Sequence, residues 1–223
     1  MLLCLDTSHG ASVALLQEYT RLGAAANEDP RQHTEALTPM IKEVVEGAGA
    51  TMADLTGIAV GTGPAPFTGL RVGLVTARTL ALALAIPAYG VSALAAVARG
   101  VFDGEDVDEA VILTDARRKE VYWARYARAG EHDVTETSPP AVARPEDLAG
   151  EIRGETIRGR GVALYPEHFD GESAELDPAA LGRIALARRA RAEREGRPVE
   201  LPTEPLYLRR PDIHQSAGRK RAS

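Results

Sequence analysis

The sequence predicts an α/β protein with a mixed sheet, built from two related halves. Near the N-terminus, an apolar run leads into Asp6 and a polar turn, and a second strand is expected over residues 11–16. The same order of strand, aspartate turn and strand returns about a hundred residues later at Asp115, with the second strand over residues 120–126. Because helical patterns lie between these two units, the alternation favours helices layered on sheets.

Two helical patterns separate the strand pairs. Residues 34–48 carry apolar side chains on one stripe and charged ones outside it, which predicts an amphipathic helix. After a short strand over residues 57–60, residues 70–86 predict a helix that is apolar almost all round, with charge only at Arg71 and Arg78. Since these arginines are seven residues apart, they share one face. Such a helix is expected to be buried on every side, by its own sheet and by a second chain.

A turn rich in glycine and proline, residues 61–69, precedes the apolar helix. Pro64 and Pro66 supply no N–H donors, so the turn is a poor cradle for phosphate. A structural turn is therefore favoured over a ligand loop. Thr68 is expected to cap the N-terminus of the helix.

The middle of the chain predicts shorter elements. Residues 87–90 end the unit of the apolar helix, and a short helix is expected over residues 92–99. Residues 128–150 are polar and rich in proline, which predicts loops. A short strand is expected near Ile157, followed by a turn at residues 159–161.

The last helix begins at Asp177 and Pro178, a favourable capping pair, and is expected to end near Gly196. A short apolar anchor at residues 204–210 follows, and then a basic tail, residues 211–223, that is expected to be disordered. The arginines of the helix predict either a solvated face or a rim that contacts phosphate in a larger assembly. These arginines are Arg183, Arg188, Arg189, Arg191, Arg194 and Arg197.

Composition and charge exclude several classes of protein. With 223 residues, the chain is long enough for a substantial core, in one large domain or two small ones. Cys4 is its only cysteine, so no internal disulfide can form and a reducing compartment is expected. Asp6 interrupts the first apolar run, which argues against a secretory signal, and residues 79–86 are too short to span a bilayer. We therefore expect a cytoplasmic protein without a membrane contact. The formal charge of −6 argues against a self-sufficient nucleic-acid binder.

Candidate catalytic groups are sparse. No two histidines lie four residues apart and no Gly-x-Ser-x-Gly run occurs, so neither a helix-borne metal pair nor a nucleophile elbow is expected. Asp6 and Asp115 are the best titratable candidates, with Thr7 beside the first, because carboxylates at the ends of paired strands can hold a magnesium-bound phosphate. Each aspartate could instead cap its own turn. No catalytic residue, metal ligand or cofactor is therefore assigned.

Several stretches, in order from end to end of the chain, resemble the TsaB (YeaZ) family. They are residues 3–8 (LCLDTS), 32–41 (QHTEALTPMI), the turn and helix from 61 to 86, 86–92 (IPAYGVS), 115–124 (DARRKEVYWA) and 204–209 (EPLYLR). The resemblance implies a two-lobed actin-like ATPase (ASKHA) fold, with a ribonuclease-H-like mixed sheet in each lobe and a reduced second lobe.

The implied lobes are residues 1–102 and residues 103–210, and both the last helix (178–196) and the segment 204–209 could pack back on the first lobe. The resemblance also implies a place in the bacterial machinery that puts threonylcarbamoyl on the adenosine next to the tRNA anticodon. The chain would be a scaffold for the catalytic paralogue TsaD and would work with the ATPase TsaE. It would contact tRNA only through the complex, and ATP or ADP could bind at the shared interface.

Two departures from the related motifs bear on activity. In TsaD, a metal is held by an Asn-His-x-x-x-His run after a Gly-Val pair, whereas Ala93 and Val97 occupy the histidine positions of this chain. Methyl and isopropyl groups cannot ligate a metal, so a transferase acting alone is not expected. Family members usually read Gly-Pro-Gly-Ser-Phe-Thr-Gly where residues 63–69 read GPAPFTG. Ala65 and Pro66 put in doubt any loop movement that relatives make there.

The leading hypothesis is a non-catalytic dimerisation subunit. Its helices at residues 34–48 and 70–86 would pack against a TsaD partner, or against a second copy of the chain, as a four-helix contact. The expected interface residues are Leu37, Met40, Ile41, Val44, Leu70, Leu74, Ala77, Arg78, Leu80 and Ala81.

Two other classes of function stay open. One is an ATP-dependent phosphotransferase with Asp6 and Asp115 around magnesium, or a glycoprotease-like protein acting alone. The other is a tRNA-binding module that uses the arginines of the last helix.

Overall fold

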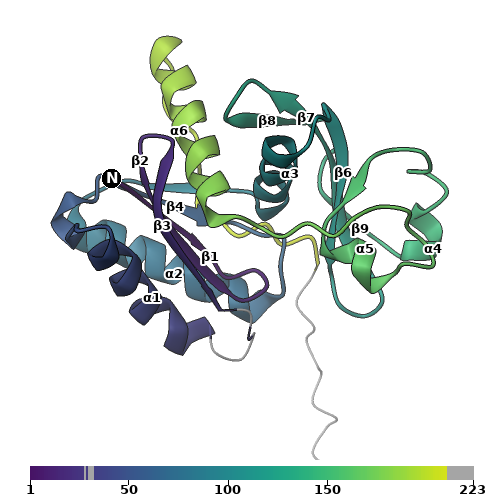
Figure 1. Cartoon of the computed structure of the whole chain (residues 1–223), viewed down its shortest axis with the longest axis horizontal. Coiled ribbons are helices and arrows are strands. Elements are labelled where there is room, and N and C mark those ends of the chain that lie inside the picture. The colour runs from purple at the N-terminus through teal and green to yellow at the C-terminus, as the bar shows by residue number, and fades with distance from the viewer. Residues whose placement is uncertain (28, 30–32, 210–223) are drawn as a thin grey trace, which may run out of the picture.

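The computed structural model describes residues 1–27, 29 and 33–209. It consists of two mixed β-sheets with helices between and outside them (Figure 1). The expected tail, residues 211–223, and the first residue of the 32–41 stretch lie outside the described residues.

The first sheet has the strand order β3-β2-β1-β4-β5. Its strands are β1 (Leu2–Asp6), β2 (Ala11–Gln17), β3 (Thr20–Asn27), β4 (Gly57–Gly61) and β5 (Ala88–Val91). The first three strands pair antiparallel, and β4 and β5 run parallel to β1. All residues of β1 are buried because helices cover both faces of the sheet.

The second sheet repeats the strand, aspartate turn and strand unit of the first. Its strands are β6 (Glu109–Asp115), β7 (Val121–Ala129), β8 (Asp133–Glu136), β9 (Ala141–Ala143) and β10 (Ile157–Arg158). β6 and β7 pair antiparallel, β10 runs parallel to β6, and β8 and β9 pair with different parts of β7.

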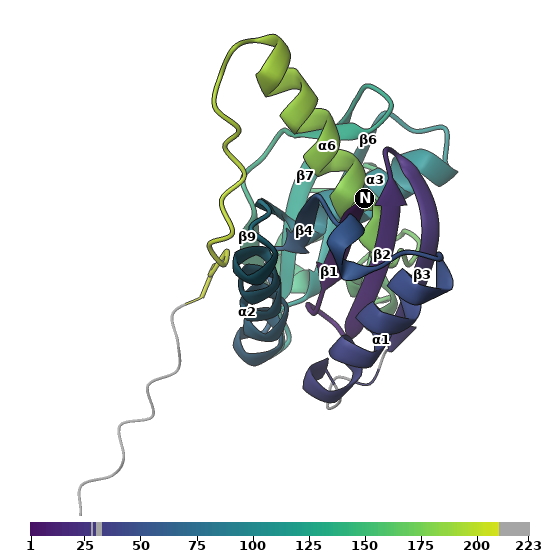
Figure 2. The same ribbon diagram turned by 90° about the vertical axis from the view of Figure 1, so that its left-hand side faces the viewer.

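Helices α1 (His33–Gly47) and α2 (Phe67–Leu84) cover the outer face of the first sheet, and the 3₁₀ turn η1 (Met52–Asp54) connects α1 to β4 (Figure 2). The core of this layer contains Leu3 and Leu5 of β1 with Ile58 and Val60 of β4. These side chains point to one face because residues two apart in a strand share a face.

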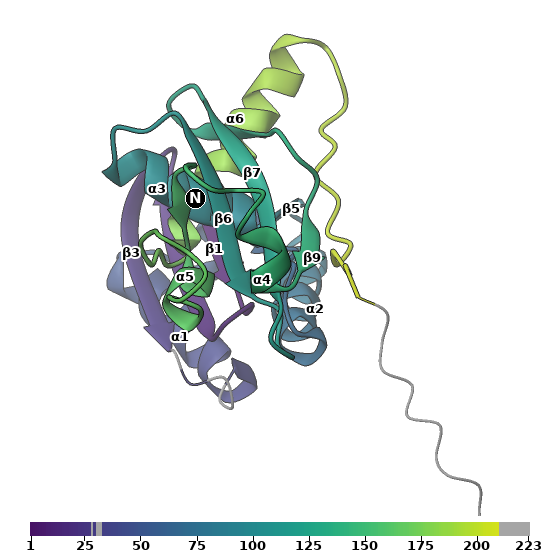
Figure 3. The same cartoon turned by 90° about the vertical axis from the view of Figure 1, so that its right-hand side faces the viewer.

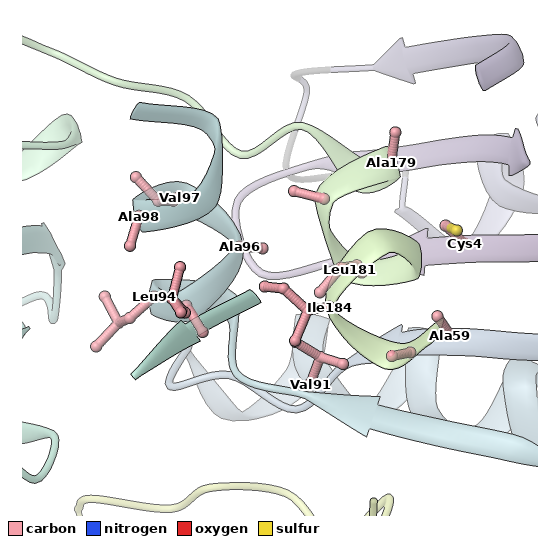
Figure 4. Close-up of a cluster of buried hydrophobic side chains, with 14 of the residues drawn as sticks. Cys4, Ala59, Val91, Leu94, Ala96, Val97, Ala98, Ala179, Leu181 and Ile184 are labelled. Atoms are coloured by element: carbon pink, nitrogen blue, oxygen red, sulfur yellow. The ribbon is translucent and has the colours of Figure 1, made fainter. Parts of the chain in front are cut away.

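Helices α3 (Ala93–Gly104) and α6 (Pro178–Arg194) form a middle layer between the two sheets. Their apolar side chains join Cys4 and Ala59 of the first sheet in one cluster (Figure 4). The same cluster includes Ile112 and Tyr126 of the second sheet. The two sheets therefore share a core through α3 and α6.

Two short helices, α4 (Pro145–Leu148) and α5 (Arg160–Leu164), lie on the outer side of the second sheet (Figure 3). They bury Leu148 and Val162 against Val111 and Leu113 of β6.

The chain returns to the first lobe after α6 as an extended segment, residues 201–209, which we call the strap (Figure 2). Gly90 N donates to Leu201 O at 2.9 Å, and Leu206 N donates to Thr62 O at 2.8 Å. Near its end, Arg209 Nη1 donates to Ala116 O at 2.9 Å. The strap thus touches both lobes.

The fold class is confirmed: both sheets are mixed, and together with their helices they form the two-lobed actin-like arrangement. Several elements differ from the sequence prediction. Residues 128–150 contain β8, β9 and α4 where loops were predicted, and β3 and β5 were missed. The expected cap at Thr68 is wrong, because α2 already begins at Phe67 with Pro66 at the capping position, where no side chain caps the helix.

Candidate functional site

A cleft lies where the ends of β1 and β6 face each other across the two lobes. Its volume is about 540 Å³. Ser8 and His9 line it from the first turn, Asp115 and Arg117 line it from the second, and α5 contributes Leu164. The cleft therefore draws on both lobes.

Asp6 lies beside the cleft, in a smaller cavity of about 130 Å³. Its carboxylate accepts hydrogen bonds from Ser8 N at 2.8 Å and from Ser8 Oγ at 2.9 Å. Burial raises the pKa of Asp6 to about 6, and the two hydrogen bonds from Ser8 oppose this shift. A Cβ on Gly61 would lie 1.9 Å from Oδ2, so glycine is required in the neighbouring strand.

The Thr7 side chain points into α2. Its Oγ1 donates to Gly69 O at 2.8 Å and accepts from Gly73 N at 3.0 Å. Thr7 is buried, and its hydroxyl is used in these two bonds. Its observed contacts are therefore structural.

Asp115 caps its own turn in the same way as Asp6. Its Oδ1 accepts from Arg117 N at 2.7 Å, and its Oδ2 pairs with the Arg117 guanidinium at 3.3 Å. The structure places Asp6 and Asp115 in adjoining cavities that share lining residues rather than in one cavity. The shared lining residues are His9, Arg160 and Glu175.

The residues at the histidine positions of the paralogue's metal run are Ala93 and Val97, both 3% exposed. Both line the smaller cavity beside Asp6, and neither side chain has an atom that can coordinate a metal. Among the described residues, no three His, Cys, Asp or Glu side chains gather into a group that could hold a metal ion.

Most residues of the expected interface are buried within the first lobe. Leu37, Met40, Ile41 and Val44 of α1 and Leu70, Leu74, Ala77 and Ala81 of α2 are each at most 8% exposed. They pack with the first sheet in one core cluster. Leu80 is half-buried, and only Arg78 is exposed. In the chain by itself one face of α2 is exposed, so its expected burial by a second chain stays a prediction.

The exposed face of α2 carries apolar residues that the sequence prediction left out. Val75 is 62% exposed and Leu82 is 85% exposed. They lie four residues after Arg71 and Arg78, respectively, on the face that these arginines mark. The positions of the two arginines were therefore the signal in the sequence that could have identified the exposed face of α2. We call Val75, Leu82 and their neighbour Phe67 the α2 apolar face; Phe67 is 38% exposed.

The strap borders this face. Arg78 donates to Thr203 Oγ1 at 2.8 Å and to Thr203 O at 2.7 Å. The Phe67 ring stacks on Tyr207 with centroids 4.9 Å apart, and the Arg71 guanidinium lies 3.5 Å from the Phe67 centroid. These contacts hold the arginine side chains beside the apolar side chains.

The composition of α2 also bears on the membrane expectation. By length and composition alone, α2 could cross a membrane: its 18 residues have a mean hydropathy of 1.3 and 28% of them are buried. The expectation had considered only residues 79–86, of which residues 79–84 belong to the helix. Core helices of soluble proteins pass the same test, and α2 packs against β4 and β1.

The arginines of α6 are largely engaged in ion pairs. Arg188 and Arg191 pair with the buried Asp133 at 2.9 and 3.2 Å. Arg183 bridges Asp103 and Asp177 at 3.0 and 3.2 Å. These pairs reduce the positive charge that this helix can offer to a nucleic acid.

Comparison with known proteins adds sequence evidence to this geometry. The family model described as "TsaD: tRNA N6-adenosine threonylcarbamoyltransferase" matches residues 20–169, more than half of the chain. An uncharacterized protein of Mycobacterium tuberculosis is 37% identical over 217 residues, which cover 94% of this chain and 92% of the relative.

Relatives with informative names agree with one another. The tRNA threonylcarbamoyladenosine biosynthesis protein TsaB of Escherichia coli is 34% identical over 221 residues, covering 93% of this chain and 94% of that protein. The crystallised YeaZ of Pseudomonas aeruginosa has a TM-score of 0.76 and 31% identity, covering 93% of this chain and 99% of that one. The chain therefore belongs to the TsaB (YeaZ) family, among the sequences that the TsaD family model describes.

Proposed function

We propose that this chain is a subunit of the tRNA threonylcarbamoyladenosine biosynthesis machinery that has no active site of its own. It binds a TsaD-type paralogue and activates it for transfer of threonylcarbamoyl to the adenosine next to the anticodon. TsaE joins the complex, and the transfer chemistry belongs to the paralogue. The family relationship supports the pathway, and the α2 apolar face is the single observation that carries the binding role.

The chemistry of the cleft supports the absence of an active site. The carboxylates of Asp6 and Asp115 are bonded to the turns that they cap. Ala93 and Val97 offer no ligand atoms at the metal positions of the paralogue.

The energetics of the α2 apolar face support a protein partner. Covering a fully exposed leucine or valine gains about 1.5–3 kcal/mol per side chain. Leu82 and Val75 lie on one face of a helix that the sheet holds rigidly from behind, so little order has to be gained on binding. Arg71 and Arg78 flank the two side chains and give the contact a polar rim. A second copy of the chain could occupy the same face when the paralogue is absent.

The experiment replaces Leu82 by Asp and measures assembly with the TsaD-type paralogue by size-exclusion light scattering. Burial of an unpaired carboxylate at the interface should weaken the complex at least about tenfold and lower tRNA modification to the same extent. The matched control is Leu22→Asp on β3, which also places a carboxylate at an exposed leucine. It should leave assembly and modification unchanged.

Normal assembly of a folded Leu82→Asp protein would move the interface away from α2. Modification of tRNA by the chain alone would contradict the absence of an active site. Saturable binding of ATP with magnesium that is lost in Asp6→Asn would favour the phosphotransferase instead.

A further inference from the structure

We propose that the turn Arg117–Lys119, which we call the basic turn, is a phosphate-binding site at the rim of the cleft. The ligand is a phosphate group of an RNA backbone or of a free nucleotide. The inference goes beyond the proposed function, because that function has no need for this chain to contact phosphate directly.

The backbone of the basic turn has an unusual conformation. Arg117, Arg118 and Lys119 have φ angles of 62°, 53° and 60°, so three consecutive residues with side chains are left-handed. In this region the Cβ of an L-residue comes too close to the following carbonyl oxygen, and glycine alone avoids that contact. A turn that served only to reverse the chain would be better made from glycine.

The surrounding structure holds the turn in this conformation at both ends. Ala116 N donates to Glu120 O at 3.0 Å, and Arg117 N donates to Asp115 Oδ1 at 2.7 Å. From the strap, Arg209 donates to Ala116 O at 2.9 Å and forms an ion pair with Glu120. Strained conformations that neighbouring structure maintains in this way are concentrated at ligand sites.

The charge of the basic turn stands out against an acidic chain. The formal net charge is −6, yet this turn presents three consecutive cationic side chains that are all exposed. Asp115 partly neutralises Arg117, and Glu120 is paired with Arg209. The arginines of α6 are spread along a helix, and Arg183, Arg188 and Arg191 pair with buried or half-buried aspartates. Three adjacent exposed cationic side chains therefore concentrate positive charge at the basic turn.

A cavity of about 260 Å³ lies between the basic turn and the strap. Guanidinium groups and aromatic rings both line it: Arg117, Arg118, Arg209, Phe67, Tyr122 and Tyr207. Guanidinium forks match the oxygens of a phosphate, and rings next to them accept a stacked base. Arg117 also lines the cleft, so a phosphate bound here would lie where the two lobes meet.

The test compares the full-length chain with the double variant Arg118→Gln and Lys119→Gln. Binding is measured by fluorescence anisotropy with a labelled unmodified tRNA transcript and with a labelled ATP analogue, over a series of salt concentrations. For an RNA ligand, the variant should bind at least about fivefold more weakly. The plot of log affinity against log salt has a negative slope, and its magnitude should decrease by about one to two. The matched control, Lys42→Gln with Arg153→Gln, removes the same charge from exposed positions elsewhere and should stay within about twofold.

A second variant separates binding from the folding of the turn. Arg118→Gly with Lys119→Gly relieves the left-handed strain, so it should raise the melting temperature while it weakens phosphate binding. A residue pair with only a structural role would not combine these two effects. Loss of affinity for RNA alone identifies a backbone phosphate, and loss for the ATP analogue identifies a nucleotide.

Three results would overturn the proposal: no binding of either ligand by the wild-type chain, equal losses in the site and control variants, or equally tight binding of poly-glutamate. Light scattering with the TsaD-type paralogue keeps this test separate from the proposed function. The basic-turn variants should still assemble, whereas Leu82→Asp should fail to assemble and still bind phosphate.

Discussion

Thr7 inserts its hydroxyl into the backbone of α2 at Gly73. Oγ1 of Thr7 accepts from Gly73 N at 3.0 Å and donates to Gly69 O at 2.8 Å, two groups that a regular helix would join directly. A Cβ at position 73 would lie 2.6 Å from Oγ1, so only glycine allows this approach. The turn after β1 and the helix that carries the α2 apolar face are therefore bonded into one unit.

Thr7→Val should destabilise the protein by about 1–3 kcal/mol, because it leaves the N–H of Gly73 and the carbonyl of Gly69 without the hydroxyl that bridges them. Urea unfolding followed by circular dichroism measures this loss. Thr7→Ser keeps the hydroxyl and should lose less. If Thr7→Val matches the wild type, the helix must close its own hydrogen bond without cost.

Asp6 should make stability depend on pH in the mildly acidic range. Its folded pKa of about 6 exceeds the ordinary value, because burial disfavours the carboxylate. The folded state then binds the proton more tightly than the unfolded state, so the contribution of Asp6 to stability is highest below about pH 4, falls as the pH rises to about 6 and is level above. The loss is at most about 3 kcal/mol.

Asp6→Asn removes this ionisation and keeps the size of the side chain. The difference in unfolding free energy between the variant and the wild type should therefore grow in favour of the variant as the pH rises from 4 to 6. Urea titrations at several pH values measure this difference, in which the other titrating groups cancel. A constant difference across the range would show that Asp6 has an ordinary pKa in the folded protein.

The sequence predicted the strand pairs around Asp6 and Asp115 because apolar runs on both sides of a polar turn are legible without tertiary information. It missed β3, whose residues are mostly small or polar and mostly exposed at the edge of the sheet. It also missed β8, whose residues are mostly polar, and β9, which is only three residues long and follows two prolines. These strands are specified by pairing with β2 and β7, which local sequence does not show.

The candidate site shows a similar limit. Position at a strand end identified Asp6 and Asp115 as candidates, but the turns that consume their carboxylates depend on Ser8 and Arg117 in three dimensions. For α2, apolarity could not separate the side that packs on its own sheet from the exposed side. The left-handed conformation of the basic turn had no sequence signal, because arginine and lysine do not favour it.

Truncation of a side chain should destabilise the protein strongly on the buried side of α2 and very little on the exposed side. Leu74→Ala removes a side chain that is 4% exposed in the core of the first lobe, so it should cost about 2–5 kcal/mol of unfolding free energy. Leu82→Ala removes one that is 85% exposed and should stay within about 0.5 kcal/mol of the wild type. Urea unfolding of the isolated chain distinguishes them. A large loss in Leu82→Ala would mean that the chain already buries this face against another copy in solution.

Gly90→Ala should release the strap. A Cβ at position 90 would lie 2.0 Å from the carbonyl oxygen of Pro202, and the backbone of Gly90 already donates to Leu201 at 2.9 Å. The strap must move to admit a methyl group, and its movement would loosen the brace that Arg209 places on the basic turn. Hydrogen exchange followed by mass spectrometry should show faster exchange over residues 201–209.

Gly47→Ala is the matched control for this substitution. No atom lies within 4 Å of a Cβ built at position 47, which is at the end of α1, so alanine there should leave the strap unchanged and raise helix stability by up to about 1 kcal/mol. If Gly90→Ala left the exchange of the strap unchanged, the side-chain contacts of Arg78 and Arg209 would hold the strap without the close backbone approach. If exchange rose in the strap alone and phosphate binding fell with it, the brace from Arg209 would be needed to keep the basic turn in its binding conformation.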